Sequence, residues 1–118
     1  MRVICVTGMP AAGKEEFQTV AAADGYRIVR MGDVVREEAR RRGIPSTDER
    51  VGGMAHEERE RHGPAVWAER TLRQVRAARV CIDGLRSLTE LATFRKAFGR
   101  DLVVFAVVAS PATRWLRV

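Results

Sequence analysis

Short apolar runs alternate along the chain with longer stretches in which apolar residues recur at helical spacing. Runs rich in β-branched residues predict buried strands at 2–7, 26–30, 79–83 and 102–109. Helices are predicted at 14–23, 33–42, 65–77, 88–98 and 112–117, with another capped by Ser46 or Thr47 and ending near Arg61. This alternation indicates a single α/β domain, 1–118, with a parallel sheet. The last helix has scarcely begun at residue 117, so we expect the sequence to be a piece of a longer protein.

A glycine-rich segment joins the first predicted strand directly to the first predicted helix. It matches the pattern G-x-x-x-x-G-K through Gly8, Met9, Pro10, Ala11, Ala12, Gly13 and Lys14. The glycines let successive amide N–H groups turn toward phosphate oxygens, the helix directs its positive N-terminal end at the anion, and Lys14 reaches the outer phosphates. We therefore predict that this segment binds the phosphates of a nucleotide, with ATP as the expected one.

Glu15 stands where this pattern usually has a serine or threonine whose hydroxyl binds Mg²⁺. A carboxylate is also an oxygen ligand that Mg²⁺ accepts, so Glu15 is one candidate metal ligand. Its negative charge close to a triphosphate would cost on the order of 1 kcal/mol of binding. We predict that residues 8–15 bind the nucleotide and that Glu15 lowers the affinity for Mg·ATP.

Further polar residues follow the ends of the other predicted strands, where ligands bind in open α/β sheets. Asp83 is placed to hold a Mg²⁺-bound water or to accept a proton from an attacking hydroxyl. Arg36 and Arg86 are candidates to bind an acceptor phosphate or the transferring phosphoryl group. Asp33 either caps the helix that carries Arg36 or orients the acceptor. Arg86 could instead form a surface ion pair, and for Arg114 a ligand role and a structural role are equally supported.

The net charge of +6 and the isoelectric point of about 10.6 come almost entirely from arginine, since Lys14 and Lys96 are the only lysines. Such a balance fits nucleic-acid binding, and it equally fits an arginine-lined pocket for phosphorylated small molecules. The basic residues are spread along the chain, and the short run Arg40–Arg42 is expected on a solvated helix end. Aromatic residues are few and are not interleaved with the basic ones, so nucleic acid ranks last among the expected partners.

Cys5 and Cys81 each lie inside an apolar run, which predicts buried thiols without a metal or redox role. His56 and His62 are six residues apart and so do not share a helix face, which argues against a zinc motif. The apolar start is too short for a signal peptide, and no run reaches membrane-spanning length. We expect a cytoplasmic protein that does not bind membranes.

Taken together, four motifs resemble the P-loop nucleotide kinases related to adenylate kinase and dephospho-CoA kinase, and most closely the archaeal UPF0200 family. They are V-T-G-M-P-x-A-G-K at 6–14, M-G-D-V-V-R at 31–36, I-D-G-x-R-S at 82–87 and A-S-P-x-T-R at 109–114. The resemblance implies a doubly wound parallel sheet with flanking helices, ATP as phosphoryl donor and Mg²⁺ as cofactor. It also implies that Arg36 and Arg86 bind the phosphate of the acceptor. The lid and the fifth strand of such kinases would follow the last residue of this chain.

Three functions are compatible with these residues. The first is a kinase that transfers the γ-phosphoryl group of ATP to a phosphorylated small molecule such as a nucleotide, using Lys14, Asp83 and Arg86. The second is a nucleotide-binding module or weak NTPase without efficient transfer, because of Glu15 and the expected lack of a lid. The third is a basic protein associated with nucleic acid that uses ATP as a switch. Neither the acceptor nor the oligomeric state follows from the sequence.

Overall fold

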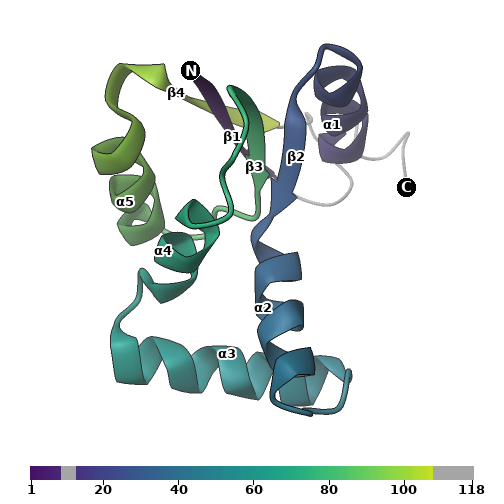
Figure 1. Cartoon of the computed structure of the whole chain (residues 1–118), viewed down its shortest axis with the longest axis vertical. Coiled ribbons are helices and arrows are strands. Elements are labelled where there is room, and N and C mark those ends of the chain that lie inside the picture. The colour runs from purple at the N-terminus through teal and green to yellow at the C-terminus, as the bar shows by residue number, and fades with distance from the viewer. Residues whose placement is uncertain (9–12, 108–118) are drawn as a thin grey trace, which may run out of the picture.

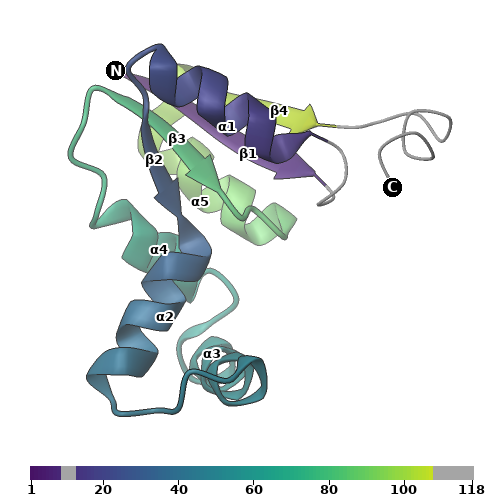
Figure 2. The same cartoon turned by 90° about the vertical axis from the view of Figure 1, so that its right-hand side faces the viewer.

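The computed structural model describes residues 1–8 and 13–107, and these form a parallel sheet with helices on both faces (Figures 1 and 2). The strands are β1 (Arg2–Gly8), β2 (Arg27–Arg30), β3 (Arg79–Asp83) and β4 (Leu102–Val107). The helices are α1 (Lys14–Ala23), α2 (Met31–Arg41), α3 (Asp48–His62), α4 (Val66–Leu72) and α5 (Leu88–Phe98), and a 3₁₀ turn, Gly99–Asp101, precedes β4. The predicted doubly wound P-loop fold is confirmed.

The strands lie in the order β2-β3-β1-β4, and all the neighbouring pairs are parallel. Every strand therefore ends at the same edge of the sheet. The chain leaves β1 toward β2 over one face, whereas it leaves β3 toward β4 over the other. At the neighbouring ends of β1 and β3, the two connections therefore separate to opposite faces of the sheet. Open α/β sheets bind ligands at such a position.

Alternating residues of the strands build two separate apolar layers. Helix α1 covers one face, where Phe17 and Ala21 pack around Val6 and Cys81. The other face is covered by α4 and α5, and its core contains the fully buried side chains of Trp67 and Phe94. Burying apolar side chains on both faces explains why the strands read as continuous apolar runs in the sequence.

Both cysteines are free and buried in the sheet, as predicted. Burial raises the pKa of the Cys5 thiol to about 12, with a smaller contribution from neighbouring Cys81. Burial likewise raises the pKa of Cys81 to about 11, and the nearby charge of Asp83 adds to this effect. Neither thiol is ionised near neutral pH, so neither is activated as a nucleophile.

Helices α2 and α3 leave the sheet at the strand ends, and Figure 1 shows α2 continuing from β2 while α3 runs across below it. Helix α2 begins at Met31, two residues before the predicted start, with Arg30 in the N-cap position. The interpretation of Asp33 as the N-cap is therefore wrong, because Asp33 lies within the first turn. Thr47 caps α3 as predicted: its hydroxyl accepts a hydrogen bond from the Arg50 N–H at 3.3 Å.

Helix α4 ends at Leu72, whereas the sequence predicted a helix over 65–77. The next residues form a turn in which the Gln74 N–H donates to the Thr71 carbonyl at 2.9 Å. The chain must reverse there to reach β3 at Arg79, so this connection overrides the helical propensity of 73–77. Strand β4 is described as far as Val107, and the predicted helix at 112–117 lies outside the described residues.

The run Arg40–Arg42 lies at the C-terminal end of α2, where it is exposed as expected. Arg40 binds Glu37, and Arg41 and Arg42 bind Glu38. These arginines are paired within their own helix end instead of forming an unpaired basic surface. Within the part of the chain that is described, no helix has both the length and the apolar character needed to cross a membrane.

Candidate active site

The strand and the helix that a phosphate loop requires are both present. Strand β1 ends at Gly8, and α1 starts at Lys14. Gly13 precedes the helix with φ 95°, a left-handed conformation that a residue with a Cβ rarely adopts. The intervening loop residues Met9, Pro10, Ala11 and Ala12, all predicted to bind the nucleotide, lie outside the described residues.

The side chains of Lys14 and Asp83 lie in contact at the neighbouring carboxyl ends of β1 and β3. The Lys14 Nζ lies 3.0 Å from the Asp83 Oδ1, and the two side chains are 21% and 11% exposed. This contact has the distance of an ion pair but lacks hydrogen-bond geometry, so Oδ1 has no hydrogen-bond partner among the described residues. The structure thus brings two of the predicted catalytic residues together.

A buried carboxylate oxygen without a hydrogen bond fits the predicted Mg²⁺ site, because Mg²⁺ and its bound waters seek oxygen acceptors. Asp83 meets this condition directly. Glu15 lies in the first turn of α1, and its side chain is exposed. Of the two predicted metal ligands, Asp83 therefore has the stronger support from the geometry.

Two further polar residues, Gln18 and Arg30, lie near the carboxyl ends of the strands, and sequence analysis did not single them out. Gln18 is 3% exposed, and its Oε1 accepts a hydrogen bond from Arg30 at 3.1 Å. Arg30 ends β2 directly beside Asp83, since the two residues are paired in the sheet. Gln18 is four residues after Lys14 and so shares its face of α1, a spacing that would have identified it.

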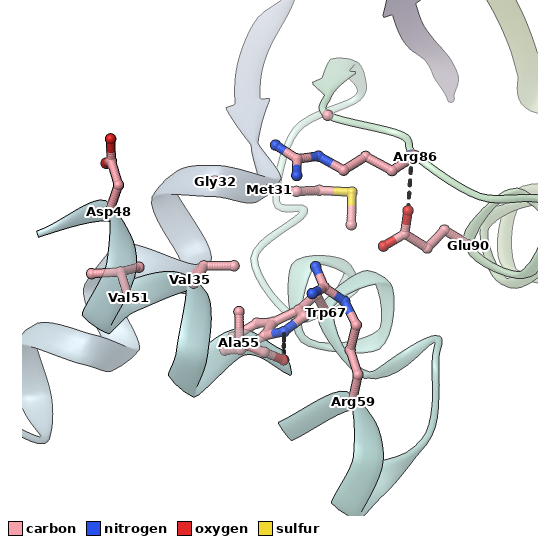
Figure 3. A pocket seen from close by; sticks show the side chains of 12 residues that line it. Met31, Gly32, Val35, Asp48, Val51, Ala55, Arg59, Trp67, Arg86 and Glu90 are labelled. Atoms are coloured by element: carbon pink, nitrogen blue, oxygen red, sulfur yellow. Dashed lines mark hydrogen bonds between the residues drawn. The ribbon is translucent and has the colours of Figure 1, made fainter. Parts of the chain in front are cut away.

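A cavity of about 330 Å³ lies next to these strand ends, between α2, α3, α4 and the loop after β3 (Figure 3). Its volume is at the lower end of the range for small-molecule sites. It is lined by Met31, Gly32, Val35, Asp48, Val51, Gly52, Ala55, Arg59, Trp67, Gly84, Arg86 and Glu90. Arg86, predicted to bind the acceptor phosphate, is among these residues, whereas Arg59 was not predicted.

The cavity walls are held by hydrogen bonds between its own lining residues. The indole N–H of Trp67 donates to the carbonyl of Ala55 at 3.2 Å. The Arg86 backbone N–H donates to the carboxylate of Glu90 at 2.9 Å, and Glu90 is 3% exposed. Trp67 and Glu90 thus have polar partners in the walls, while the guanidinium groups of Arg59 and Arg86 have no ion pair or hydrogen bond among the described residues.

The other two predicted acceptor residues, Asp33 and Arg36, lie outside this cavity. They bind each other at 2.5 Å on the surface of α2, where their side chains are 60% and 62% exposed. The Arg36 guanidinium lies over Gly32, which does line the cavity, so this pair borders the cavity without entering it. Arg114 lies outside the described residues.

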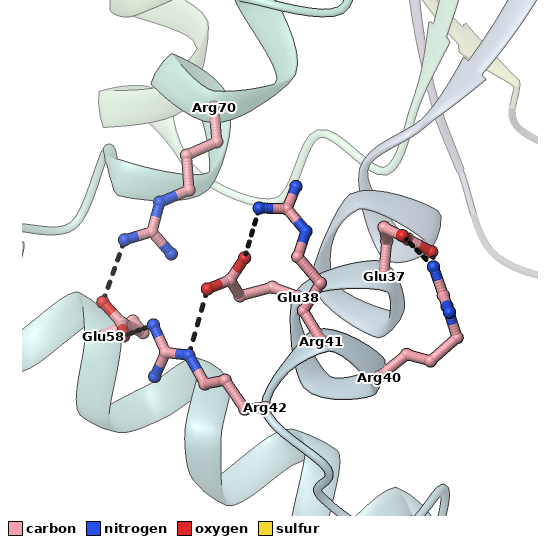
Figure 4. Close-up of polar contacts among 7 residues, drawn as sticks. All are labelled: Glu37, Glu38, Arg40, Arg41, Arg42, Glu58 and Arg70. Atoms are coloured by element: carbon pink, nitrogen blue, oxygen red, sulfur yellow. Dashed lines mark hydrogen bonds and ion pairs between the residues drawn. The ribbon is translucent and has the colours of Figure 1, made fainter.

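The α3 wall of the cavity is attached to α2 and α4 through Glu58 (Figure 4). This carboxylate is 3% exposed and binds Arg42, which follows α2, and Arg70 of α4, the latter at 3.0 Å. His62 lies one turn further along α3, with its Nε2 3.3 Å from Glu58. The hydrogen bond from Arg42 lowers the pKa of Glu58 more than its burial raises it. Glu58 therefore holds the three helices together as a charged group.

The histidines of the rejected zinc motif have separate partners on α3. His56 lies 2.9 Å from Glu60, and His62 lies beside Glu58. Each histidine thus faces a glutamate four residues away along the helix.

Residues 7–117 match the family described as AAA domain. The chain belongs to this family. The match supports nucleotide binding at the P-loop of this AAA domain.

Archaeal UPF0200 proteins are similar to this AAA domain over almost all of its length, which confirms the predicted resemblance. The protein of Hyperthermus butylicus is 45% identical over 119 residues, covering 98% of the chain and 63% of the relative. The protein of Thermoplasma volcanium is 41% identical over 117 residues, covering 98% and 65%. A UPF0200/UPF0201 protein of Archaeoglobus fulgidus is 42% identical over 123 residues, covering 100% and 38%. The chain thus spans less than two thirds of the length of these relatives.

Replacing Gly84 with alanine tests the close approach that forms one cavity wall. Gly84 has φ 108°, and a Cβ there would lie 3.3 Å from the Cβ of Met31. We expect Gly84→Ala to lower the free energy of unfolding of this AAA domain by roughly 1–3 kcal/mol, measured by denaturant titration. Gly53→Ala is the matched control, because a Cβ at this helical position meets nothing within 4 Å. The control is expected to be about 0.5–1 kcal/mol more stable than wild type, and a Gly84→Ala variant of wild-type stability would contradict the packing.

Replacing Glu58 with glutamine tests the charged contact between the three helices. We expect Glu58→Gln to lower the free energy of unfolding by about 1–2 kcal/mol at pH 7. The value is modest because the Arg42 side chain is 38% exposed. The folded pKa of Glu58 lies below its ordinary value of 4.5, so its stabilisation is present above pH 4.5 and is lost as the pH falls through the folded pKa.

The stability difference between wild type and Glu58→Gln should therefore be largest at neutral pH and shrink in acid. Urea titrations between pH 7 and pH 3 measure it. Glu57→Gln serves as the control, because Glu57 is exposed on the same helix. A difference that stays constant over this pH range would show that the charge of Glu58 makes no contribution.

Proposed function

We propose that this AAA domain binds ATP with Mg²⁺ and transfers the γ-phosphoryl group to a phosphorylated small molecule such as a nucleotide. The observation that carries the proposal is the contact between Lys14 and Asp83 next to the arginine-containing cavity. Both lie at the carboxyl ends of the strands, so a donor on the phosphate loop and an acceptor in the cavity would face each other. The cytoplasm is the expected compartment.

In the proposed reaction an oxygen of the acceptor forms a bond to the γ-phosphorus, and the bond to the bridging oxygen breaks to release ADP. Lys14 would bind the outer phosphates and offset the charge that develops on them. Asp83, and with less geometric support Glu15, would hold the Mg²⁺, which would neutralise charge on the β- and γ-phosphates. The remaining task of the protein is to position the acceptor and exclude water.

Arg86 supports the acceptor role of the cavity, because its guanidinium is able to bind a phosphate group in a bidentate way. Asp33 and Arg36 remain proposed acceptor residues at the rim. To reach a ligand in the cavity, Arg36 would first have to leave Asp33.

A nucleotide-binding module or weak NTPase is the second candidate function. Glu15 supports it, because this exposed carboxylate stands at the N-terminal end of α1 where a phosphate would be bound. A negative side chain there stabilises the free helix and competes with an anionic ligand for the same positive end.

An acceptor screen on the full-length protein distinguishes the two candidates. For a kinase, we expect at least one nucleoside monophosphate or dephospho-CoA to raise ADP release about tenfold or more over ATP alone. Lys14→Ala should remove most of this rate, roughly 100-fold, because charge stabilisation on the phosphates is lost. Lys96→Ala is the matched control, since Lys96 is the other lysine of the chain and is exposed on α5.

Thermal stabilisation by ATP without acceptor-dependent ADP release would contradict transfer and favour the binding module. Acceptor-dependent ADP release that is unchanged in Lys14→Ala would show that the phosphate loop takes no part in the reaction.

Replacing Glu15 with serine tests the charge at the start of α1. We expect Glu15→Ser to bind Mg·ATP about fivefold more tightly, which corresponds to on the order of 1 kcal/mol of relieved repulsion. Isothermal titration calorimetry measures the affinity. Glu16→Ser is the control, since Glu16 is exposed in the same turn. Unchanged or weaker binding by Glu15→Ser would show that Glu15 does not oppose the nucleotide.

A further inference from the structure

Five arginines of α2, its C-terminal cap and α4 already hold a carboxylate. Such ion pairs join Arg36 to Asp33, Arg40 to Glu37, Arg41 and Arg42 to Glu38, and Arg42 and Arg70 to Glu58. These cations are neutralised within the protein itself. A ligand would have to displace a carboxylate in order to reach any of them.

Arg59 and Arg86, like the exposed Arg50 and Arg61 of α3, have no ion pair among the residues that the structure describes. Arg59 and Arg86 are set apart because both line the cavity, and neither guanidinium has a hydrogen bond among those residues. Glu90 also lines the cavity, but it is 3% exposed and its carboxylate accepts the backbone N–H of Arg86. Asp48 lies at the start of α3, and Figure 3 shows its carboxylate directed away from Arg59. Two arginines thus remain able to receive an anion in one cavity.

The position of Arg59 follows from helical spacing. Gly52, Ala55 and Arg59 are separated by three and four residues, so they share one face of α3, and all of them line the cavity. Gly52 leaves room on this face, since a Cβ there would meet nothing within 4 Å. Arg59 is partly buried and rises beside Trp67, whereas Arg86 enters from the loop after β3 (Figure 3). The two cations therefore reach the cavity from separate elements.

We propose that Arg59 joins Arg86 in binding the phosphate monoester of the acceptor, as a residue in addition to those that the family resemblance assigns. This inference rests on the proposed function. Arginine binds phosphate through paired N–H groups, and two unneutralised arginines in one cavity favour a dianion. Part of the remaining wall is apolar, formed by Met31, Val35 and Trp67, and an aromatic or apolar group attached to the phosphate would pack against it.

Trp67 supplies a binding signal that does not depend on turnover. The 118 residues contain two tryptophans, so in this chain Trp115→Phe leaves Trp67, which lines the cavity, as the only one. The probes are AMP, ribose 5-phosphate, orthophosphate and adenosine, titrated into this chain without ATP. We expect AMP to bind most tightly, ribose 5-phosphate more weakly because it lacks an apolar group, and adenosine more weakly because it lacks the phosphate.

The variants Arg59→Gln and Arg86→Gln are each expected to weaken AMP binding roughly tenfold or more and to leave adenosine binding almost unchanged. Arg61→Gln is the matched control, because Arg61 is exposed on the same helix. Should Arg59→Gln fail to fold, as judged by its thermal transition, Arg59→Lys replaces it: this variant keeps the charge but loses paired hydrogen bonding, and a several-fold weaker affinity is expected.

Three results would overturn the proposal. They are AMP binding by Arg59→Gln or Arg59→Lys within twofold of wild type, equal binding of adenosine and AMP, and no binding of any phosphate probe at millimolar concentration. Parallel ADP-release measurements separate the two proposals. AMP binding that depends on Arg59 without acceptor-dependent release would refute the proposed transfer alone, whereas acceptor-dependent release unaffected by Arg59→Gln would refute the role of Arg59 alone.

Discussion

The parallel pairing of β1 with β3 is the constraint on which the rest of the structure depends. Val6 is paired with Asp83 across these strands, so the end of β1 and Asp83 lie side by side at one edge of the sheet. Because the chain leaves β1 and β3 over opposite faces, the two connections separate at this edge. Lys14, at the start of α1, then lies within 3.0 Å of Asp83. The cavity adjoins the same edge, since Gly84 continues β3 and approaches Met31 at the start of α2.

A second constraint is the distribution of charge on the helices beyond this edge. A chain with a net charge of +6 must separate its arginines or neutralise them, and α2 neutralises those at its C-terminal end with glutamates at helical spacing. Glu58 extends this neutralisation across helices, because it binds Arg42 and Arg70 while nearly all of its surface is covered. The same pairing joins α3, which forms one wall of the cavity, to α4. The arginines left without carboxylates within the described part of the cavity are consequently a local feature that the overall charge does not reveal.

The sequence predicted the strands closely, because buried parallel strands are short, β-branched and bounded by glycine or charge; 79–83 matches β3 residue for residue. The strand–loop–helix context of Lys14 was equally predictable, since the motif is local. The end of α4 was not, because residues 73–77 favour a helix and only the need to reach β3 prevents one. Arg59 was missed for a related reason: its spacing from Gly52 and Ala55 is visible in the sequence, but which face of α3 adjoins the strand ends is a tertiary property.

The contact between Lys14 and Asp83 shows how such a site can be stable before a nucleotide is bound. Each charge is largely covered, so each would be costly without its partner. In the proposed function the phosphates of the nucleotide would replace Asp83 beside Lys14. Mg²⁺ or its waters would bind the Asp83 oxygen that has no hydrogen bond among the described residues. Each group would thereby exchange one opposite charge for another, and neither would be left buried and alone. Binding of the metal–nucleotide complex would then require little rearrangement of the strand ends, which is the condition for electrostatic preorganisation of phosphoryl transfer.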